Sequence, residues 1–198
     1  MEDEYPDLEI YLCRHGETEW TLSGQHTSYS DIPLTENGES QAQKLRDRLE
    51  GIEFEKVYSS PLMRAKTTCD IVGLGELAEI MDDLFEWNYG ELEGKTTPEI
   101  RQTMPGWTVF NDGAPGGESV ADVGARADRV INLVKKYSGK VALFSSGHFS
   151  RVLAARWLGL SAGKGRCLAL DTASLSILGY ERDVPVIRLW NNTDFLQN

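Results

Sequence analysis

The chain has 198 residues, of which 40% are hydrophobic and 26% charged, a length and composition typical of one globular domain. Its formal net charge of −11 argues against a general binder of nucleic acids or anionic membranes, because such proteins display a basic surface. A small anionic substrate is still compatible with this charge, since a pocket can be locally positive within an acidic protein.

The sequence carries no targeting or membrane signal. Its start, MEDEYPD, lacks the basic and apolar regions of a signal peptide, and no apolar stretch approaches the roughly 18 residues of a membrane span. The three cysteines, Cys13, Cys69 and Cys167, form no CxxC pair, so we interpret them as reduced thiols. These features predict a cytoplasmic protein.

The first part of the chain alternates strand and helix patterns. Apolar, β-rich runs that end at turn residues predict strands, and apolar residues at helical spacing between a Thr or Pro start and a Gly stop predict helices. The predicted elements are a strand at 8–13, a loop at 24–34, a helix from Thr35 to Gly51, a strand at 56–60 and a helix from Pro61 to about Val72.

The second part continues this alternation after an interruption. Residues 86–117 are rich in Gly, Pro and Trp, which predicts a lid-like excursion. The alternation predicts an α/β fold of one domain over 1–198, with a mostly parallel sheet. The other predicted elements are a strand within 77–85, a short helix near 97–103, an amphipathic helix within 118–140, a strand at 140–146, a helix at about 149–158 and two strands within 172–191.

Four polar side chains follow predicted strands. His15 and His148 each come directly after a strand, Arg14 adjoins His15, and Arg64 lies in the first turn of a helix that follows another strand. In parallel sheets, ligands bind beyond the carboxyl ends of the strands. Arginine grips two oxygens at once and helix N-termini offer free N–H groups, so the pattern predicts a phosphate site.

The histidines indicate chemistry in addition to binding. A neutral imidazole is a competent nucleophile toward phosphorus, and in-line transfer needs positive groups around the equatorial oxygens. It also needs an acid near the leaving oxygen, for which Glu86 is favoured because it opens the glycine-rich excursion directly after a strand. The other carboxylates considered for this role are Glu17, Asp82, Asp83, Glu91 and Glu93.

Four motifs carry a resemblance to a known family. RHGETEW (14–20), SSPLMRAKTT (59–68), EWNYGELEG (86–94) and SSGHFSR (145–151) resemble, in order and spacing, the four signatures of the histidine phosphatase superfamily, which is phosphoglycerate-mutase-like. The match covers nearly the whole chain. The resemblance implies a single domain with a three-layer α/β/α fold, no metal and no other cofactor.

The resemblance also implies a role for each matched residue. It makes His15 the phosphorylated nucleophile and Glu86 the proton donor, with Arg14, Arg64 and His148 completing the phosphate pocket. Substrate contacts are expected from Thr21, Gln25, Thr27, Ser28, Tyr89 and Phe149.

Two longer stretches narrow the expectation. Residues 23–41 and 83–94 look most like the sugar-phosphate phosphatases of the superfamily, of the fungal sedoheptulose-1,7-bisphosphatase type. The mutases are usually longer, with an arginine-bearing, proline-rich insertion, whereas 95–117 carries one arginine, Arg101. We therefore expect a metal-independent phosphomonoesterase acting on a small phosphorylated metabolite, a sugar phosphate. The alternatives are a phosphoglycerate mutase, a phosphoprotein phosphatase and a non-catalytic phosphate-binding module.

Two other phosphatase designs do not fit. Cysteine phosphatases place an arginine six positions after the nucleophilic cysteine, and here those positions hold Glu19, Gly75 and Ala173. A binuclear metal site would need clustered histidines and aspartates, whereas the chain has three histidines and no HxH or DxH.

Some side chains keep two interpretations at this stage. His26, in the polar loop, is either a surface residue or part of a pocket wall. The aromatic residues Trp87, Tyr89 and Trp107 either cap the core or wall a pocket. We interpret Arg101, Arg126 and Arg151 as solvated helix residues.

Overall fold

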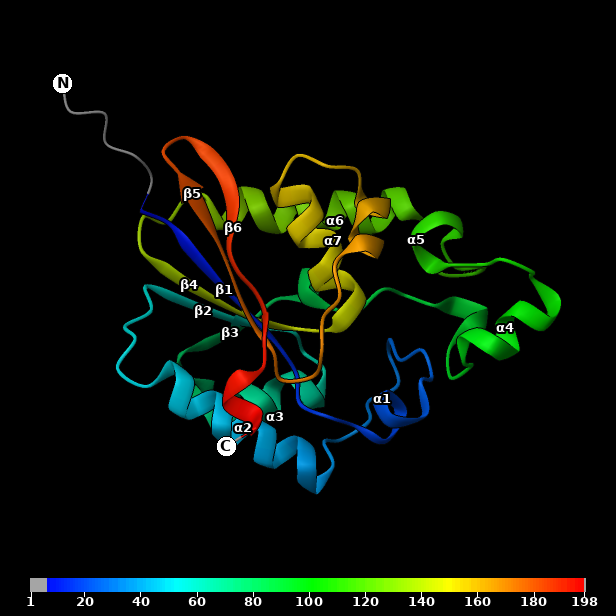
Figure 1. The fold of residues 1–198 in the computed structure, drawn as a ribbon, viewed down its shortest axis with the longest axis horizontal. Coiled ribbons are helices and arrows are strands. Elements are labelled where there is room, and N and C mark those ends of the chain that lie inside the picture. The colour runs from blue at the N-terminus through cyan, green and yellow to red at the C-terminus, as the bar shows by residue number, and fades with distance from the viewer. Residues whose placement is uncertain (1–6, 198) are drawn as a thin grey trace.

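A computed structural model describes residues 7–197, which fold around one six-stranded sheet (Figure 1). The strand order is β3-β2-β4-β1-β5-β6. The first four strands in this order pair in parallel, and the last two are antiparallel, so the sheet is mostly parallel as predicted. The strands are β1 (Glu9–Arg14), β2 (Lys56–Ser59), β3 (Ala78–Ile80), β4 (Lys140–Ser145), β5 (Leu175–Glu181) and β6 (Val184–Asn192).

Helices cover both faces of the sheet. Helices α2 and α3 lie on one face and α6 and α7 on the other, while α1, α4 and α5 gather beyond one end of the strands (Figure 1). Within the described residues, no helix is long and apolar enough to cross a membrane. The helices are α1 (Glu19–Ser23), α2 (Glu36–Leu49), α3 (Met63–Val72), α4 (Thr97–Thr103), α5 (Val109–Asp112), α6 (Val120–Val134) and α7 (Gly147–Trp157).

The alternation of β1 produces the three layers. Its side chains point to opposite faces in turn, because the period of a strand is two residues. Ile10 and Leu12 are buried in the core that includes α6 and α7. Tyr11 and Cys13 are buried in the second core, formed with α2 and α3. Both faces of this central strand are therefore covered, and the expected α/β/α sandwich is confirmed.

Several element boundaries differ from the prediction. Helix α7 begins two residues early, so that His148 falls in its first turn. Helix α6 ends at Val134, before the polar run that follows it, and β3 spans only three residues. Helix α1 was not predicted, because a five-residue helix is too short to show hydrophobic periodicity. It forms at a capping box in which Thr18 and Thr21 bond reciprocally.

The segment 86–117 is packed onto the body of the molecule. Trp87, Trp107 and Phe110 are buried in the same core as α6 and α7. Within this segment, the backbone N–H of Gly94 donates to the carbonyl of His26 at 2.8 Å, which ties the segment to the loop after α1. The predicted short helix of this segment is confirmed as α4.

The loop after β1 meets α2 backbone to backbone. A Cβ built on Gly16 would lie 2.4 Å from the carbonyl oxygen of Gly38, and one built on Gly38 would lie 2.1 Å from that of Glu17. Real side chains do not tolerate such distances. Glycine at both positions therefore lets α2 support the segment that carries His15.

We predict that Gly38→Ala lowers the free energy of unfolding by about 1–3 kcal/mol, the usual cost of overpacking a rigid site. Intrinsic helix propensity alone would give the opposite sign. Urea denaturation measures the change, and Ser40→Ala, an exposed position on the same helix, is the control. Equal stability of the two variants would show that the backbone contact does not constrain this loop.

Candidate active site

The two histidines of the motifs are brought together by the pairing of β1 with β4. In this parallel pair, Arg14 lies opposite Ser145, so both strands end at the same level. The backbone N–H of His15 then donates to the carbonyl of Ser145 at 3.0 Å. Because α7 follows directly after β4, His148 lies at the same edge of the sheet.

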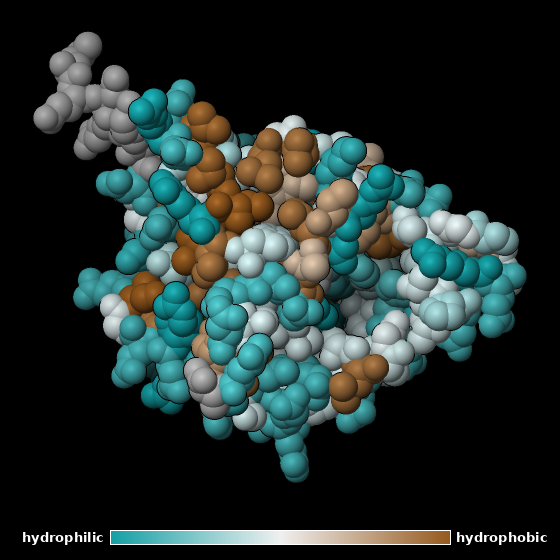
Figure 2. Space-filling model, viewed as in Figure 1, coloured by the Kyte–Doolittle hydropathy of each residue, from teal (hydrophilic) through white to brown (hydrophobic). Residues whose placement is uncertain are grey.

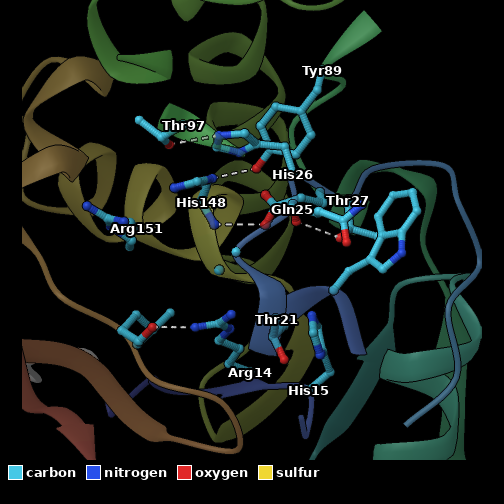
Figure 3. A pocket seen from close by; sticks show the side chains of 15 residues that line it. Arg14, His15, Thr21, Gln25, His26, Thr27, Tyr89, Thr97, His148 and Arg151 are labelled. Carbon is cyan, nitrogen blue, oxygen red and sulfur yellow. Dashed lines mark hydrogen bonds between the residues drawn. The ribbon is translucent and has the colours of Figure 1, made fainter. Parts of the chain in front are cut away.

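A cavity of about 270 Å³ opens at this edge (Figures 2 and 3). Figure 2 shows the surface hollowed between the end of the sheet and the α4–α5 segment. Most of the predicted site residues line this cavity: Arg14, His15, Thr21, Gln25, Thr27, Glu86, Tyr89 and His148. Three predicted residues do not line it: Ser28, Arg64 and Phe149.

His15 is held as a neutral imidazole with a free Nε2. Its Nδ1 lies 2.7 Å from the carbonyl oxygen of Gly16. A carbonyl only accepts, so Nδ1 carries the proton and Nε2 keeps its lone pair. Burial, followed by the charges of Arg64 and Arg14, holds the pKa of His15 well below 6.5. The imidazole therefore stays unprotonated at neutral pH.

We assign the opposite tautomer to His148. The hydroxyl of Tyr89 bonds to its Nδ1 (Figure 3). Burial, followed by the charge of Glu86, raises the pKa of Tyr89 well above 10, so the phenol keeps its proton, and with the phenol as donor the Nδ1 of His148 accepts. Burial and Arg151 hold the pKa of His148 well below 6.5. We therefore assign the His148 proton to Nε2, where it can be donated to a bound oxyanion.

The carboxylate of Glu86 is oriented by backbone N–H groups. Its Oε1 accepts from Trp87 at 2.8 Å and from Phe149 at 2.7 Å, and its Oε2 accepts from His148 at 2.9 Å. Two of these donors belong to the first turn of α7, whose free N–H groups attract a negative charge. Phe149 contributes through its backbone only, because its side chain is fully buried in the core.

Arg14 lies against the start of α7. A Cβ on Gly147 would lie 3.2 Å from the Cζ of Arg14, so glycine at this position makes room for the guanidinium. One terminal nitrogen of Arg14 donates to the carbonyl of Leu170 (Figure 3). Among residues 7–197, no hydrogen-bond partner reaches its buried Nε.

Arg64 lies behind the cavity wall. Its side chain is buried and donates to three carbonyl oxygens of the loop 27–30, each at 3.1 Å. From the other side, the carboxylate of Glu93 accepts from the backbone N–H groups of Ser28 and Ser30. Arg64 and Ser28 therefore shape the loop, and the charge of Arg64, after burial, contributes to the lowered pKa of His15.

The structure adds wall residues that sequence reasoning left open or missed. His26 is buried with its Nε2 3.2 Å from the hydroxyl of Thr97, and its ring centroid lies 4.7 Å from that of Tyr89. Burial lowers the pKa of His26 to about 4. Of its two interpretations, the pocket wall is therefore correct. Trp20, the last residue of the RHGETEW motif, and Thr97 also line the cavity, although sequence analysis named neither as a site residue.

Two of the three arginines interpreted as solvated are not solvated. Arg126 is buried because residues 83–86, which we call the strap, and Glu118 pack over its face of α6. Helical periodicity shows which residues share a face, but it does not show what packs on that face. It pairs with Glu118 at 2.7 Å and donates to three carbonyls of the strap at 2.6–3.1 Å. Arg151 is partly buried at the cavity, and Arg101 is exposed as predicted.

The assembled groups suit phosphoryl chemistry. An unprotonated Nε2, an N–H donor, two arginines and an oriented carboxylate converge on one side of the sheet. Within residues 7–197, no three His, Cys, Asp or Glu side chains lie together as potential metal ligands. The arrangement can hold a phosphoryl group and present it to His15.

Comparison with known proteins matches this chain to one family. The sequence model of the histidine phosphatase superfamily (branch 1) matches residues 10–193. An acid phosphatase of Mycobacterium tuberculosis is 40% identical over 179 residues, 88% of each chain. Sedoheptulose 1,7-bisphosphatase of Saccharomyces cerevisiae is 31% identical over 221 residues, 94% of this chain and 80% of the relative. A solved structure of an open reading frame product of Mycobacterium tuberculosis has a TM-score of 0.90 at 38% identity, covering 93% of this chain and 97% of that one.

We predict that Arg126→Gln lowers the free energy of unfolding by about 3–5 kcal/mol, because it leaves a half-buried carboxylate and three carbonyls without their partner. It should also lower kcat, since the strap ends at Glu86. Arg129→Gln is the control: its pair with Asp83 is exposed, so we expect less than about 1 kcal/mol. Urea denaturation and phosphatase assays compare the two variants. Similar losses of stability would contradict the interpretation that Arg126 holds the strap in place.

Proposed function

The chain belongs to the histidine phosphatase superfamily and is a phosphatase, and from this premise we propose that it is a metal-independent phosphomonoesterase with a phosphohistidine intermediate. Its substrate is a small phosphorylated metabolite, a sugar phosphate. The observation that carries the proposal is the neutral His15, whose Nδ1 bonds to a carbonyl and whose unprotonated Nε2 shares one cavity with His148, Arg14 and Glu86.

In the first step, the lone pair of His15 Nε2 attacks phosphorus. A P–N bond forms as the P–O bond to the leaving group breaks. Glu86, protonated before the step, gives its proton to the leaving oxygen, so that an alcohol departs. Its place on the cavity wall supports this role, and the N–H groups at the start of α7 stabilise the carboxylate that this step leaves behind.

In the second step, a water molecule attacks the phosphorus of phosphohistidine. Glu86, now a carboxylate, takes a proton from this water as the P–O bond forms. The P–N bond breaks, its electrons return to Nε2, and inorganic phosphate is released. The hydrogen bond from Nδ1 to Gly16 holds the ring in one orientation through both steps.

Positive groups of the chain take the place that a metal ion has in other phosphatases. Arg14 and the His148 N–H face the cavity, and Arg64 adds its charge from behind the wall. Such preorganised donors stabilise the charge on the equatorial oxygens in the transition state.

The dimensions of the cavity support a small substrate. At about 270 Å³, it is walled on one side by Glu86, Tyr89 and Thr97 of the 86–117 segment. A phosphoprotein would need a shallower and more open site. The similarity to sedoheptulose 1,7-bisphosphatase further supports a sugar phosphate.

We predict that His15→Ala lowers kcat for p-nitrophenyl phosphate by at least about a thousandfold, with EDTA leaving wild-type turnover unchanged. Phosphate release from a panel of sugar phosphates, with and without EDTA, is the measurement. In a rapid quench with ³²P-labelled substrate, wild type should retain an acid-labile, alkali-stable label that His15→Ala lacks. Loss of activity in EDTA would overturn metal independence, and turnover only with a bisphosphorylated primer would indicate a mutase.

The role of Glu86 has a separate signature. Glu86→Gln should lower kcat for an alkyl phosphate such as glycerol phosphate by about 10²–10⁴-fold. The loss should be much smaller for p-nitrophenyl phosphate, whose leaving group departs without a proton. Parallel assays of both esters test this, and equal losses would show that Glu86 acts by holding the start of α7 in place.

A further inference from the structure

A second cavity, of about 250 Å³, adjoins the first. His26, Thr97, His148 and Arg151 line both cavities, so the second lies directly beyond the wall of the proposed phosphate site. We refer to it as the side cavity. Its remaining wall comes from α4, from the segment around α5 and from the 3₁₀ turn Ala162–Cys167.

Three arginines line the side cavity from three different elements. Arg101 comes from α4, Arg151 from α7 and Arg166 from the 3₁₀ turn. No Asp or Glu lines this cavity, and within residues 7–197 none of the three arginines forms an ion pair. Arg101 and Arg166 are exposed and Arg151 is partly buried, so in a chain of net charge −11 this cavity offers three cations and no carboxylate to an incoming anion.

Each guanidinium is held by a hydrogen bond to the protein and keeps at least one nitrogen available for a ligand. The Nε of Arg101 donates to the carbonyl of Trp107 at 2.9 Å, and the Nε of Arg151 donates to that of Gly165 at 3.1 Å. One terminal nitrogen of Arg166 donates to Asn111 at 3.3 Å. In the described residues, both terminal nitrogens of Arg101 and one of each other arginine make no hydrogen bond to protein.

Other features of the wall are consistent with a polar ligand. Arg151 also stacks on Phe110, with its Cζ 4.4 Å from the ring centroid, which fixes the plane of the guanidinium. The hydroxyl of Thr108, another wall residue, is buried without a hydrogen-bond partner among residues 7–197. Buried hydroxyls are normally satisfied, so this one is available to a ligand.

We propose that the side cavity binds a second anionic group of the substrate, a phosphate or a carboxylate, through Arg101, Arg151 and Arg166. The substrate is then a doubly anionic metabolite that spans the two cavities past His148. This inference rests on the proposed function, because it takes the first cavity as the place of the reacting phosphate. Arg151, at the boundary, contacts either group.

The test compares phosphate esters that carry either one or two phosphate groups. Glucose 1,6-bisphosphate is assayed against glucose 1-phosphate and glucose 6-phosphate, for wild type and for the double variant Arg101→Gln/Arg166→Gln. We expect the kcat/KM ratio of the bisphosphate over the monophosphates to fall by about tenfold or more, through KM, because each lost contact is a charge-assisted hydrogen bond. Arg46→Gln/Arg48→Gln, which removes two exposed charges from α2, is the matched control and should keep the wild-type ratio.

A binding measurement tests the same proposal without depending on turnover. Calorimetry on the His15→Ala background should show the same fall in preference for the bisphosphate when Arg101 and Arg166 are replaced. An unchanged ratio, or equal losses for all three esters, would overturn the proposal. If added inorganic phosphate increased the hydrolysis rate of the monophosphates, the side cavity would bind a free anion, and this result would also overturn the proposal. If wild type bound the bisphosphate preferentially but hydrolysed none of the three esters, the proposed function would be overturned, whereas the anion subsite would be supported.

Discussion

The site depends on the parallel pairing of β1 with β4. Because the two strands end level, the residue after one and the first helical turn after the other lie at one edge of the sheet. His15 is fixed there by its backbone bond to Ser145, and His148 by the direct passage from strand to helix. Neither histidine needs a long flexible connection, so their separation is determined by the sheet and not by loops.

Buried arginines that bond to carbonyls extend this rigidity to the loops. Arg64 holds the carbonyls of loop 27–30, and Arg126 holds those of the strap that leads to Glu86. A planar guanidinium can satisfy several carbonyls at once, which lysine cannot. Segments without regular structure are thereby fixed in place, and the wall residues they carry are positioned as firmly as those on strands and helices.

Sequence analysis predicted those features of the fold and of the site that a local residue pattern encodes. The apolar run of β1, the Thr35 cap of α2 and the motif residues at strand ends each carry a signal within a few residues. Together with the alternation of strands and helices, they led to the α/β fold and to the residues around His15. Helix α1 and the wall residue Thr97 carry no such signal. Arg126 was misjudged because its helix shows only which residues share a face, whereas its burial is caused by the strap and Glu118 packing over it. Phe149 was misjudged because its motif position acts through a backbone N–H.

Charge in this molecule is organised locally. The chain as a whole is strongly acidic, but the buried imidazoles lie near Arg14, Arg64 and Arg151, and these charges lower the imidazole pKa values beyond the effect of burial. A positive potential in a small, partly buried cavity selects anions regardless of the net charge, because nearby charges dominate where solvent screening is weak. The same potential keeps the imidazole of His15, the proposed nucleophile, unprotonated before an anion arrives. Attraction of the substrate and readiness of His15 therefore come from one arrangement of arginines.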